Sequence, residues 1–171
     1  GYDCSHSIIG TIADWQPSDY EEFVIAIGDM EVRKKVAELL TSKGGVFASL
    51  IHPTALIGDN SSLDRGLIMY SYSKINVNCT VGEFVSLASF VSIGHDTEVG
   101  NFCALSTGCV ITGRVKIGHL VFIGPNSTVL PNVSVGNHVF AAGGSVVMTN
   151  IKAGMRIMGN PARPFLPNTS K

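Results

Sequence analysis

A six-residue period dominates the chain between Ile57 and Val147. Stepping by six residues, sixteen successive positions are all apolar, and no insertion breaks the register. Since 45% of the 171 residues are apolar, sixteen such positions in a row have a chance probability on the order of 10⁻⁶. The positions are Ile57, Leu63, Met69, Ile75, Val81, Leu87, Ile93, Val99, Leu105, Ile111, Ile117, Ile123, Val129, Val135, Ala141 and Val147. The chain therefore contains a structural repeat.

Two other positions of each hexad are also restricted. The residue two before each apolar position is mostly Ala, Ser, Cys, Thr or Val, and glycine often follows the apolar residue. Neither the helical period of 3.6 nor the strand period of two explains this spacing. A three-sided solenoid does, because each hexad then forms one flat face and three hexads complete a coil. We predict slightly more than five coils, stacked about 4.8 Å apart, with the aliphatic residue pointing inward.

The predicted fold class is mainly β, with a parallel β-helix over residues 53–171 and a partial α/β domain over residues 1–52. In the small domain, residues 23–27 and 46–51 read as buried strands and residues 30–40 as the helix between them. We expect this domain to be truncated at its start, because so few elements make too small a sheet. Beyond the repeat, residues 155–158 predict a last strand, and residues 159–164 a rigid turn.

The composition of the chain limits the kinds of partner that it is expected to bind. The formal charge of −1 gives no electrostatic case for binding nucleic acid or a membrane surface. No apolar run approaches the roughly 20 residues that span a bilayer, and we expect no signal peptide. Of the four cysteines, Cys79, Cys103 and Cys109 fall on the small inner position of a hexad. We expect reduced core thiols in a cytoplasmic protein, with Cys4 also reduced.

Histidine is the residue type on which the chemistry depends. Some hexapeptide solenoids bind zinc through three convergent histidines. Here His95 and His119 lie four hexads apart, and therefore on different faces, while His138 is out of phase with both. We predict no metal site. His6 has no supporting context, and His52 precedes a proline at the junction between the two domains.

His95 has the strongest context for catalysis. The next residue, Asp96, could orient the ring or stabilise its protonated form. Gly113 follows His95 by three hexads, so the two lie one coil apart. The glycine N–H could bind the carbonyl oxygen of a thioester, which together with the base makes an acyl-transfer site. The alternative is that Gly113 serves only as a turn residue.

Asp29, at the start of the predicted helix, has two interpretations. Its carboxylate could cap the helix, or it could accept a hydrogen bond from the ribose or base of a nucleotide substrate. A carboxylate at this place would repel a phosphate.

Three motifs carry a family resemblance. They are residues 93–96 (Ile-Gly-His-Asp), residues 142–147 (Ala-Gly-Gly-Ser-Val-Val) and residues 159–163 (Gly-Asn-Pro-Ala-Arg). The chain resembles the hexapeptide-repeat acetyltransferases of nucleotide-activated amino sugars, of the bacillosamine and perosamine type, and sialic acid O-acetyltransferase-like proteins. The similarity runs from about Phe23 to Arg163 and includes the turn at residues 26–29. It implies that the β-helix winds left-handed.

The resemblance also implies roles and partners. His95 would be the general base, Asp96 its acidic partner and Gly113 the backbone donor to the thioester carbonyl of acetyl-CoA. The expected CoA-binding residues are Gly143 and Gly144 along the pantetheine arm, and Asn160, Pro161, Ala162 and Arg163 near the nucleotide end. The family forms homotrimers with CoA in the groove between neighbouring prisms. The acceptor would be the amine of a nucleotide-linked amino sugar, with Asp29 as a candidate substrate-binding residue.

Two departures from the family leave the acceptor open. Relatives begin with a strand and a glycine-rich turn that help to hold the sugar nucleotide, and neither is present in this sequence. Some relatives have a second histidine nine residues after the base, where this chain has Ala104. Two alternatives therefore remain: acetyl transfer to a sugar hydroxyl, and a non-catalytic trimeric scaffold or sugar-nucleotide binding module.

Overall fold

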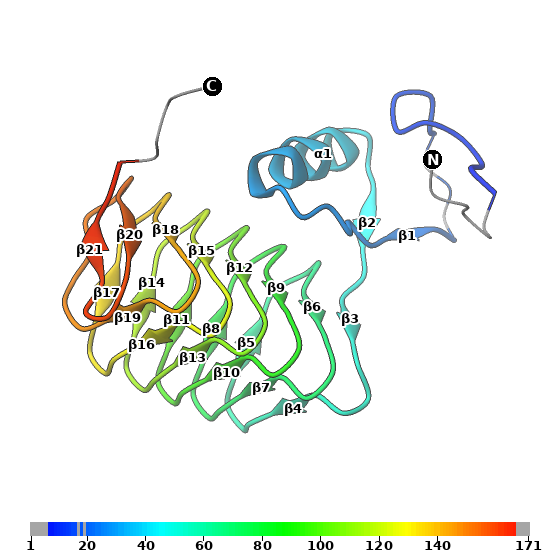
Figure 1. Cartoon of the computed structure of the whole chain (residues 1–171). Coiled ribbons are helices and arrows are strands. Elements are labelled where there is room, and N and C mark those ends of the chain that lie inside the picture. Colours follow the sequence, from blue (N-terminus) through cyan, green and yellow to red (C-terminus); the bar gives the residue numbers. More distant parts are fainter. Residues whose placement is uncertain (1–6, 17, 19, 167–171) are drawn as a thin grey trace.

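A three-sided prism of stacked coils forms the body of the molecule (Figure 1). The computed structural model describes residues 7–16, 18 and 20–166. The prism is a left-handed parallel β-helix, so the predicted fold class is confirmed. Parallel strands are ordinarily joined by right-handed connections, and this prism winds in the opposite sense. No helix in the described part of the chain is long and apolar enough to cross a membrane.

Each side of the prism is a ladder of short strands. Face one contains β3 (Leu50–Ile51), β6 (Ile68–Met69), β9 (Ser86–Leu87), β12 (Ala104–Leu105), β15 (Phe122–Ile123), β18 (Phe140–Ala141), β20 (Arg156–Met158) and, antiparallel at its end, β21 (Arg163–Pro164). Face two contains β4 (Leu56–Ile57), β7 (Lys74–Ile75), β10 (Ser92–Ile93), β13 (Val110–Ile111), β16 (Thr128–Val129) and β19 (Val146–Val147). Face three contains β5 (Ser62–Leu63), β8 (Thr80–Val81), β11 (Glu98–Val99), β14 (Lys116–Ile117) and β17 (Ser134–Val135).

The register of these ladders is the predicted one. Ile93 pairs with Ile111 above it and Ile75 below it, each three hexads away. The inner aliphatic residues from Met69 to Val147 are all 4% exposed or less. Ile57 is 42% exposed because it lies in the first coil, at the open end of the prism. Burial of each inner Leu or Ile stabilises the fold by about 1.5–3 kcal/mol, so the repeat supplies the core.

The repeat changes at both ends of the prism. The stack starts with β3, one strand before the first hexad of the sequence pattern, because Leu50 and Ile51 pair with β6. After β19 the coil is shorter, so Ile151 bridges to Val135 two positions earlier than the register predicts. The expected last strand is confirmed as β20, which pairs with β18.

A left-handed backbone conformation recurs at every corner. The φ angle is positive at every sixth residue from Asn60 to Gly144, and most of these residues are not glycine. Side chains in this region of φ ordinarily cost energy, and Asn and Asp tolerate it best. The corner between faces two and three is the most polar: it stacks Asn60, Asn78, Asp96, Arg114 and Asn132.

The N-terminal α/β unit is smaller than the sequence predicts. Helix α1 (Met30–Ser42) matches the expectation, but the expected strand over residues 23–27 is only β1 (Glu22–Phe23). The expected strand over residues 46–51 divides into two: β2 (Val46–Phe47) pairs with β1, whereas β3 joins the prism. The run reads as one strand in the sequence because it is apolar apart from Ser49, although its residues belong to two different sheets.

Aromatic and arginine side chains attach this unit to the prism. Phe47 packs edge-on against Phe84 at 4.9 Å between ring centroids. Arg33 of α1 is 3% exposed and donates hydrogen bonds to the Ile27 carbonyl and, across the interface, to the carbonyls of Phe102 and Cys103. Burial lowers the pKa of this guanidinium. The helix is therefore held against the corner between faces three and one.

Candidate active site

His95 lies at the corner between faces two and three. Ile93 is fully buried inside the prism, and the chain turns outward through Gly94. A Cβ on Gly94 would lie 2.5 Å from the Thr112 carbonyl carbon, so the close approach of two coils requires glycine here. The turn leaves the His95 and Asp96 side chains about half exposed, at 49% and 47%. The sequence pattern thus places both groups where a substrate can reach them.

The two ring nitrogens of His95 have different surroundings. Its Nδ1 hydrogen-bonds to Asp96 Oδ2 at 2.7 Å. Its Nε2 faces the next coil, where a Cβ on Gly113 would lie 2.6 Å away. The prediction that Gly113 stacks directly above His95 is confirmed, and glycine is required because any side chain would displace the ring.

The Gly113 N–H donates to no acceptor among the described residues, although the neighbouring Arg114 N–H donates to the His95 carbonyl at 2.8 Å. A free backbone donor beside a base is what an acyl-transfer site needs, since a carbonyl oxygen that gains charge must be stabilised. The stacking is therefore observed, and the role of the Gly113 N–H stays a prediction.

Asp96 has a second partner that the sequence interpretation missed. Asn78, one coil below, donates from Nδ2 to Asp96 Oδ1 at 3.0 Å. Hydrogen bonds from His95 and Asn78 hold the pKa of the Asp96 carboxyl below its ordinary value, so it is ionised at neutral pH. The signal in the sequence is the separation of three hexads between Asn78 and Asp96, the same separation that identifies Gly113.

The inner cysteines take no part in this chemistry. Cys79, Cys103 and Cys109 are free thiols and at most 1% exposed, as predicted for core residues. Burial raises the pKa of Cys103 to about 12 and that of Cys109 to about 11, and it also raises the pKa of Cys79. Protonated, buried thiols are poor nucleophiles. Cys4 lies outside the described residues.

The other histidines are bonded differently. His119 Nδ1 accepts a hydrogen bond from the Asn101 N–H at 2.9 Å, and His52 Nδ1 contacts the Thr54 hydroxyl and N–H. His138 lies 3.4 Å from a carboxylate oxygen of Glu31. Within residues 7–16, 18 and 20–166, no group of three His, Cys, Asp or Glu side chains is arranged to hold a metal. His6 lies outside this part of the chain.

The expected CoA-binding residues occupy another corner. Gly143 and Gly144 form the turn from β18 to β19, between faces one and two, and Gly144 has a φ of +70°. This turn lies nearly three coils above His95, or about 13 Å along the axis. Asn160 to Arg163 connect β20 to β21 at the end of face one, where the Ala162 N–H donates to the Val146 carbonyl. One chain therefore does not bring this group to His95.

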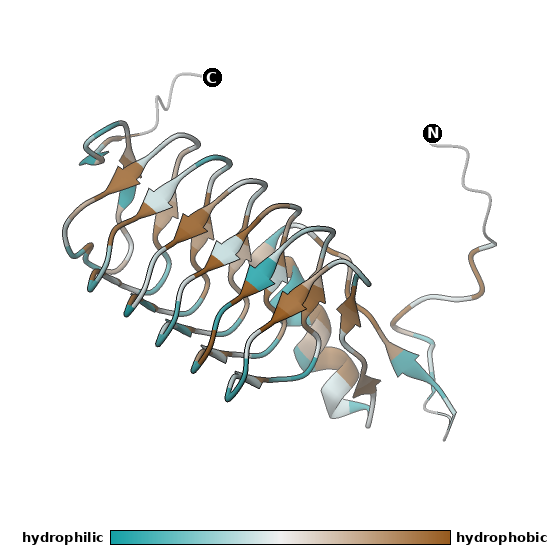
Figure 2. Ribbon diagram, turned by 90° about the horizontal axis from the view of Figure 1, so that it is seen from below, coloured by the Kyte–Doolittle hydropathy of each residue, from teal (hydrophilic) through white to brown (hydrophobic). Residues whose placement is uncertain are grey.

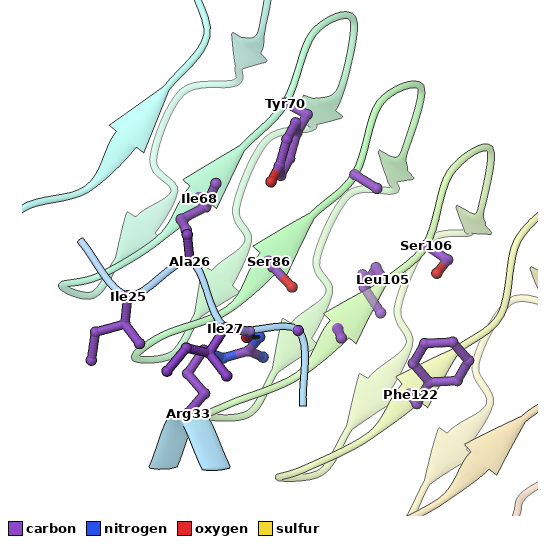
Figure 3. Close-up of a pocket in the computed structure, with 13 residues that line it drawn as sticks. Ile25, Ala26, Ile27, Arg33, Ile68, Tyr70, Ser86, Leu105, Ser106 and Phe122 are labelled. Carbon is purple, nitrogen blue, oxygen red and sulfur yellow. Dashed lines mark hydrogen bonds between the residues drawn. The ribbon is translucent and has the colours of Figure 1, made fainter. Parts of the chain in front are cut away.

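Asp29 caps helix α1. Its Oδ1 accepts a hydrogen bond from the Val32 N–H at 2.9 Å, which confirms the capping interpretation. The turn before it, at residues 25–28, faces the outer side of face one across a cleft of about 330 Å³ (Figure 3). Ile68, Ser86 and Ala104 line the opposite wall, so the place of the second histidine of some relatives lies in this cleft.

Solved structures share this architecture. PerB from Caulobacter crescentus, determined with CoA and GDP-perosamine, is 25% identical with a TM-score of 0.82, over 83% of this chain and 69% of that chain. The acetyltransferase domain of PglB from Neisseria gonorrhoeae, determined with acetyl coenzyme A, is also 25% identical, with a TM-score of 0.68 over 84% of this chain and 70% of that chain. The resemblance to the hexapeptide-repeat sugar acetyltransferases is confirmed.

A third structure shows the fold alone. WeeI from Acinetobacter baumannii is 22% identical, with a TM-score of 0.66 over 88% of this chain and 73% of that chain. No protein-family model matches the chain. The likeness to the sugar acetyltransferases is therefore one of three-dimensional structure.

Proposed function

We propose that this protein is an acetyl-CoA-dependent acetyltransferase that acetylates the amine of a nucleotide-linked amino sugar. One observation carries the proposal: His95 is bonded to Asp96 through Nδ1, and its Nε2 faces the Gly113 backbone one coil above. The likeness to proteins solved with CoA, acetyl-CoA and GDP-perosamine supports the choice of substrates.

The chemistry is direct transfer without a covalent enzyme intermediate. The amine nitrogen of the sugar attacks the thioester carbonyl carbon as His95 Nε2 takes a proton from that nitrogen. The N–C bond forms, the C–S bond breaks, and CoA leaves as the thiolate. Asp96 stabilises the imidazolium, and the Gly113 N–H stabilises the charge that develops on the carbonyl oxygen. The buried thiols are not needed.

The proposal includes a homotrimer with CoA between neighbouring prisms. The Gly143–Gly144 turn and His95 lie on different corners of one chain, which suits a site that takes residues from two chains. The faces also differ in the first residue of their strands: on face three these are Ser62, Thr80, Glu98, Lys116 and Ser134, whereas faces one and two include apolar ones. Figure 2 shows face two in front, with several of its strands coloured as hydrophobic. Light scattering of the purified protein would test this assembly.

We place the protein in the cytoplasm, because its three buried cysteines are free thiols. On this account the acceptor lies in the cleft beneath residues 25–28 of a neighbouring chain, because this cleft is on face one and His95 lies at the corner between faces two and three. Asp29 directly follows Gly28, which lines the cleft. Asp29 Oδ1 is engaged in the helix cap, so only its second oxygen is open to a ribose or base.

The test is an acceptor panel. Purified protein is incubated with acetyl-CoA and nucleotide-linked sugars that carry an amine or a hydroxyl at the same carbon, with thiol release and product mass as readouts. We expect acetylation of the amine. Transfer to hydroxyls alone would make the protein an O-acetyltransferase. Absence of transfer, with no CoA binding by calorimetry, would favour the scaffold.

A further inference from the structure

Opposite charges one coil apart form ion pairs elsewhere on this prism. The pairs are Arg65–Glu83, at 2.9 Å, and Lys116–Glu98, at 2.8 Å. Asp96 and Arg114 have the same separation of one coil and the same left-handed corner conformation, with φ of 54° and 59°. Both residues are described by the structure, yet no ion pair joins them. The exception lies at the candidate active site.

Two asparagines of the same corner hold these two charges apart. Asn78, below, donates to Asp96 Oδ1 at 3.0 Å, and Asn132, above, accepts from Arg114 Nε at 2.8 Å. The remaining Asp96 oxygen, Oδ2, bonds to His95 at 2.7 Å. Asp96 is therefore bonded to the asparagine below it and Arg114 to the asparagine above it, and neither is bonded to the other.

We propose that Asn78 is a positioning residue that reserves Asp96 for His95, because it holds Oδ1 and so keeps the carboxylate from turning to Arg114. The inference deepens the proposed acetyl transfer and rests on it. If Asp96 paired with Arg114, His95 Nδ1 would lose its acceptor, and the orientation of the ring would no longer be fixed. Exposed ion pairs are weak, so one hydrogen bond to an ionised carboxylate can decide this competition.

No other described charge competes for Asp96. The cation of the adjoining face, Lys116, is paired with Glu98 at 2.8 Å. Asp64 and His119 line the groove of face three beside Asp96, but His119 is bonded through Nδ1 to Asn101. Arg114 is thus the cation whose removal should cancel the effect of losing Asn78.

The test compares Asn78→Gly with Asn60→Gly. Both asparagines lie on this corner with a φ of 58°, which glycine adopts without strain, and Asn60 lies two coils below Asp96. We expect N78G to lower kcat about tenfold, by analogy with residues that orient a histidine from behind. KM for acetyl-CoA should not change.

The double variant N78G/R114N separates positioning from a structural effect. It should recover most of the lost kcat, since the competing cation is gone. An N78G enzyme that matches N60G would overturn the proposal, and so would a loss that persists in the double variant. The ¹⁵N resonance of His95 Nδ1 should shift in N78G and return in the double variant. This measurement decides the role of Asn78 even if the wild-type protein acetylates no acceptor, an outcome that would refute the proposed function instead.

Discussion

Two corners of this prism carry a histidine in the same local sequence. At one, His95 follows Ile93 and Gly94; at the other, His119 follows Ile117 and Gly118. His95 Nδ1 bonds to a carboxylate and its Nε2 faces the next coil, whereas His119 Nδ1 accepts from the Asn101 backbone and so closes a coil-to-coil contact. The local sequence does not set the role of these histidines.

The residue one coil above each histidine determines its role. Above His95 is Gly113, which has no side chain and whose N–H donates to no acceptor in the described part of the chain. Above His119 is Asn137, whose Oδ1 accepts from the His119 N–H at 2.9 Å. In a solenoid the decisive neighbour is three hexads away in the sequence, so an identical motif can serve catalysis at one corner and stability at the next.

The largest expected effect separates the two histidines by activity. His95→Ala should lower kcat about 10²–10⁴-fold, because proton transfer loses its base, while the affinity for acetyl-CoA changes little. His119→Ala should keep the wild-type kcat below its unfolding temperature. Thiol release under saturating substrates measures both. Equal losses in the two variants would contradict the division of roles.

The glycines beside the two histidines should also differ in their effects. Gly113→Ala should displace the His95 ring and lower kcat about 10²-fold, with little loss of stability, since the ring can swing into solvent. Gly118→Ala should lower the stability and leave kcat nearly unchanged. Its Cβ would clash with Asn137 Oδ1 and lie 3.0 Å from the Gly136 backbone, and this corner does not contain His95. Measuring kcat and the thermal unfolding temperature of both variants tests this difference. Full activity in G113A would remove the stacked geometry from the mechanism.

Much of this architecture follows from the period alone. In a coil of three hexads, the stacking of Gly113 above His95 is a matter of register. Asn78 was missed because an asparagine at a corner reads as a turn residue in the sequence. The same register nevertheless places it under Asp96. The division of residues 46–51 between two sheets was not predictable, since an apolar run does not show which partner each residue pairs with.

The hydrogen bond between the Asn101 N–H and His119 should contribute to stability. His119→Ala removes the acceptor of the Asn101 N–H and should cost about 1 kcal/mol of unfolding free energy. His119→Asn should keep most of it, because Asn101 and Asn137 already accept the equivalent bonds from Glu83 and His119 with their side-chain oxygens. Urea unfolding measures the difference. An alanine variant as stable as wild type would show that the bond contributes nothing.

The smallest expected effect is the pH dependence at the His95 corner. Since the pKa of Asp96 is lowered in the folded protein, its ionised form stabilises the fold above the ordinary carboxyl pKa of about 4. That contribution disappears as the pH falls through the lowered value. The stability advantage of wild type over Asp96→Asn should therefore shrink in acid, as followed by urea unfolding at several pH values. An advantage independent of pH would argue against the lowered pKa.

The most direct test is the ¹⁵N NMR spectrum of the two neutral imidazole rings. A base at His95 needs its proton on Nδ1, bonded to Asp96, and a free lone pair on Nε2. His119 needs the opposite tautomer, because its Nδ1 accepts from a backbone N–H. We predict Nδ1–H for His95 and Nε2–H for His119. A neutral His95 that carries its proton on Nε2 could not accept one there, and this result would contradict the account.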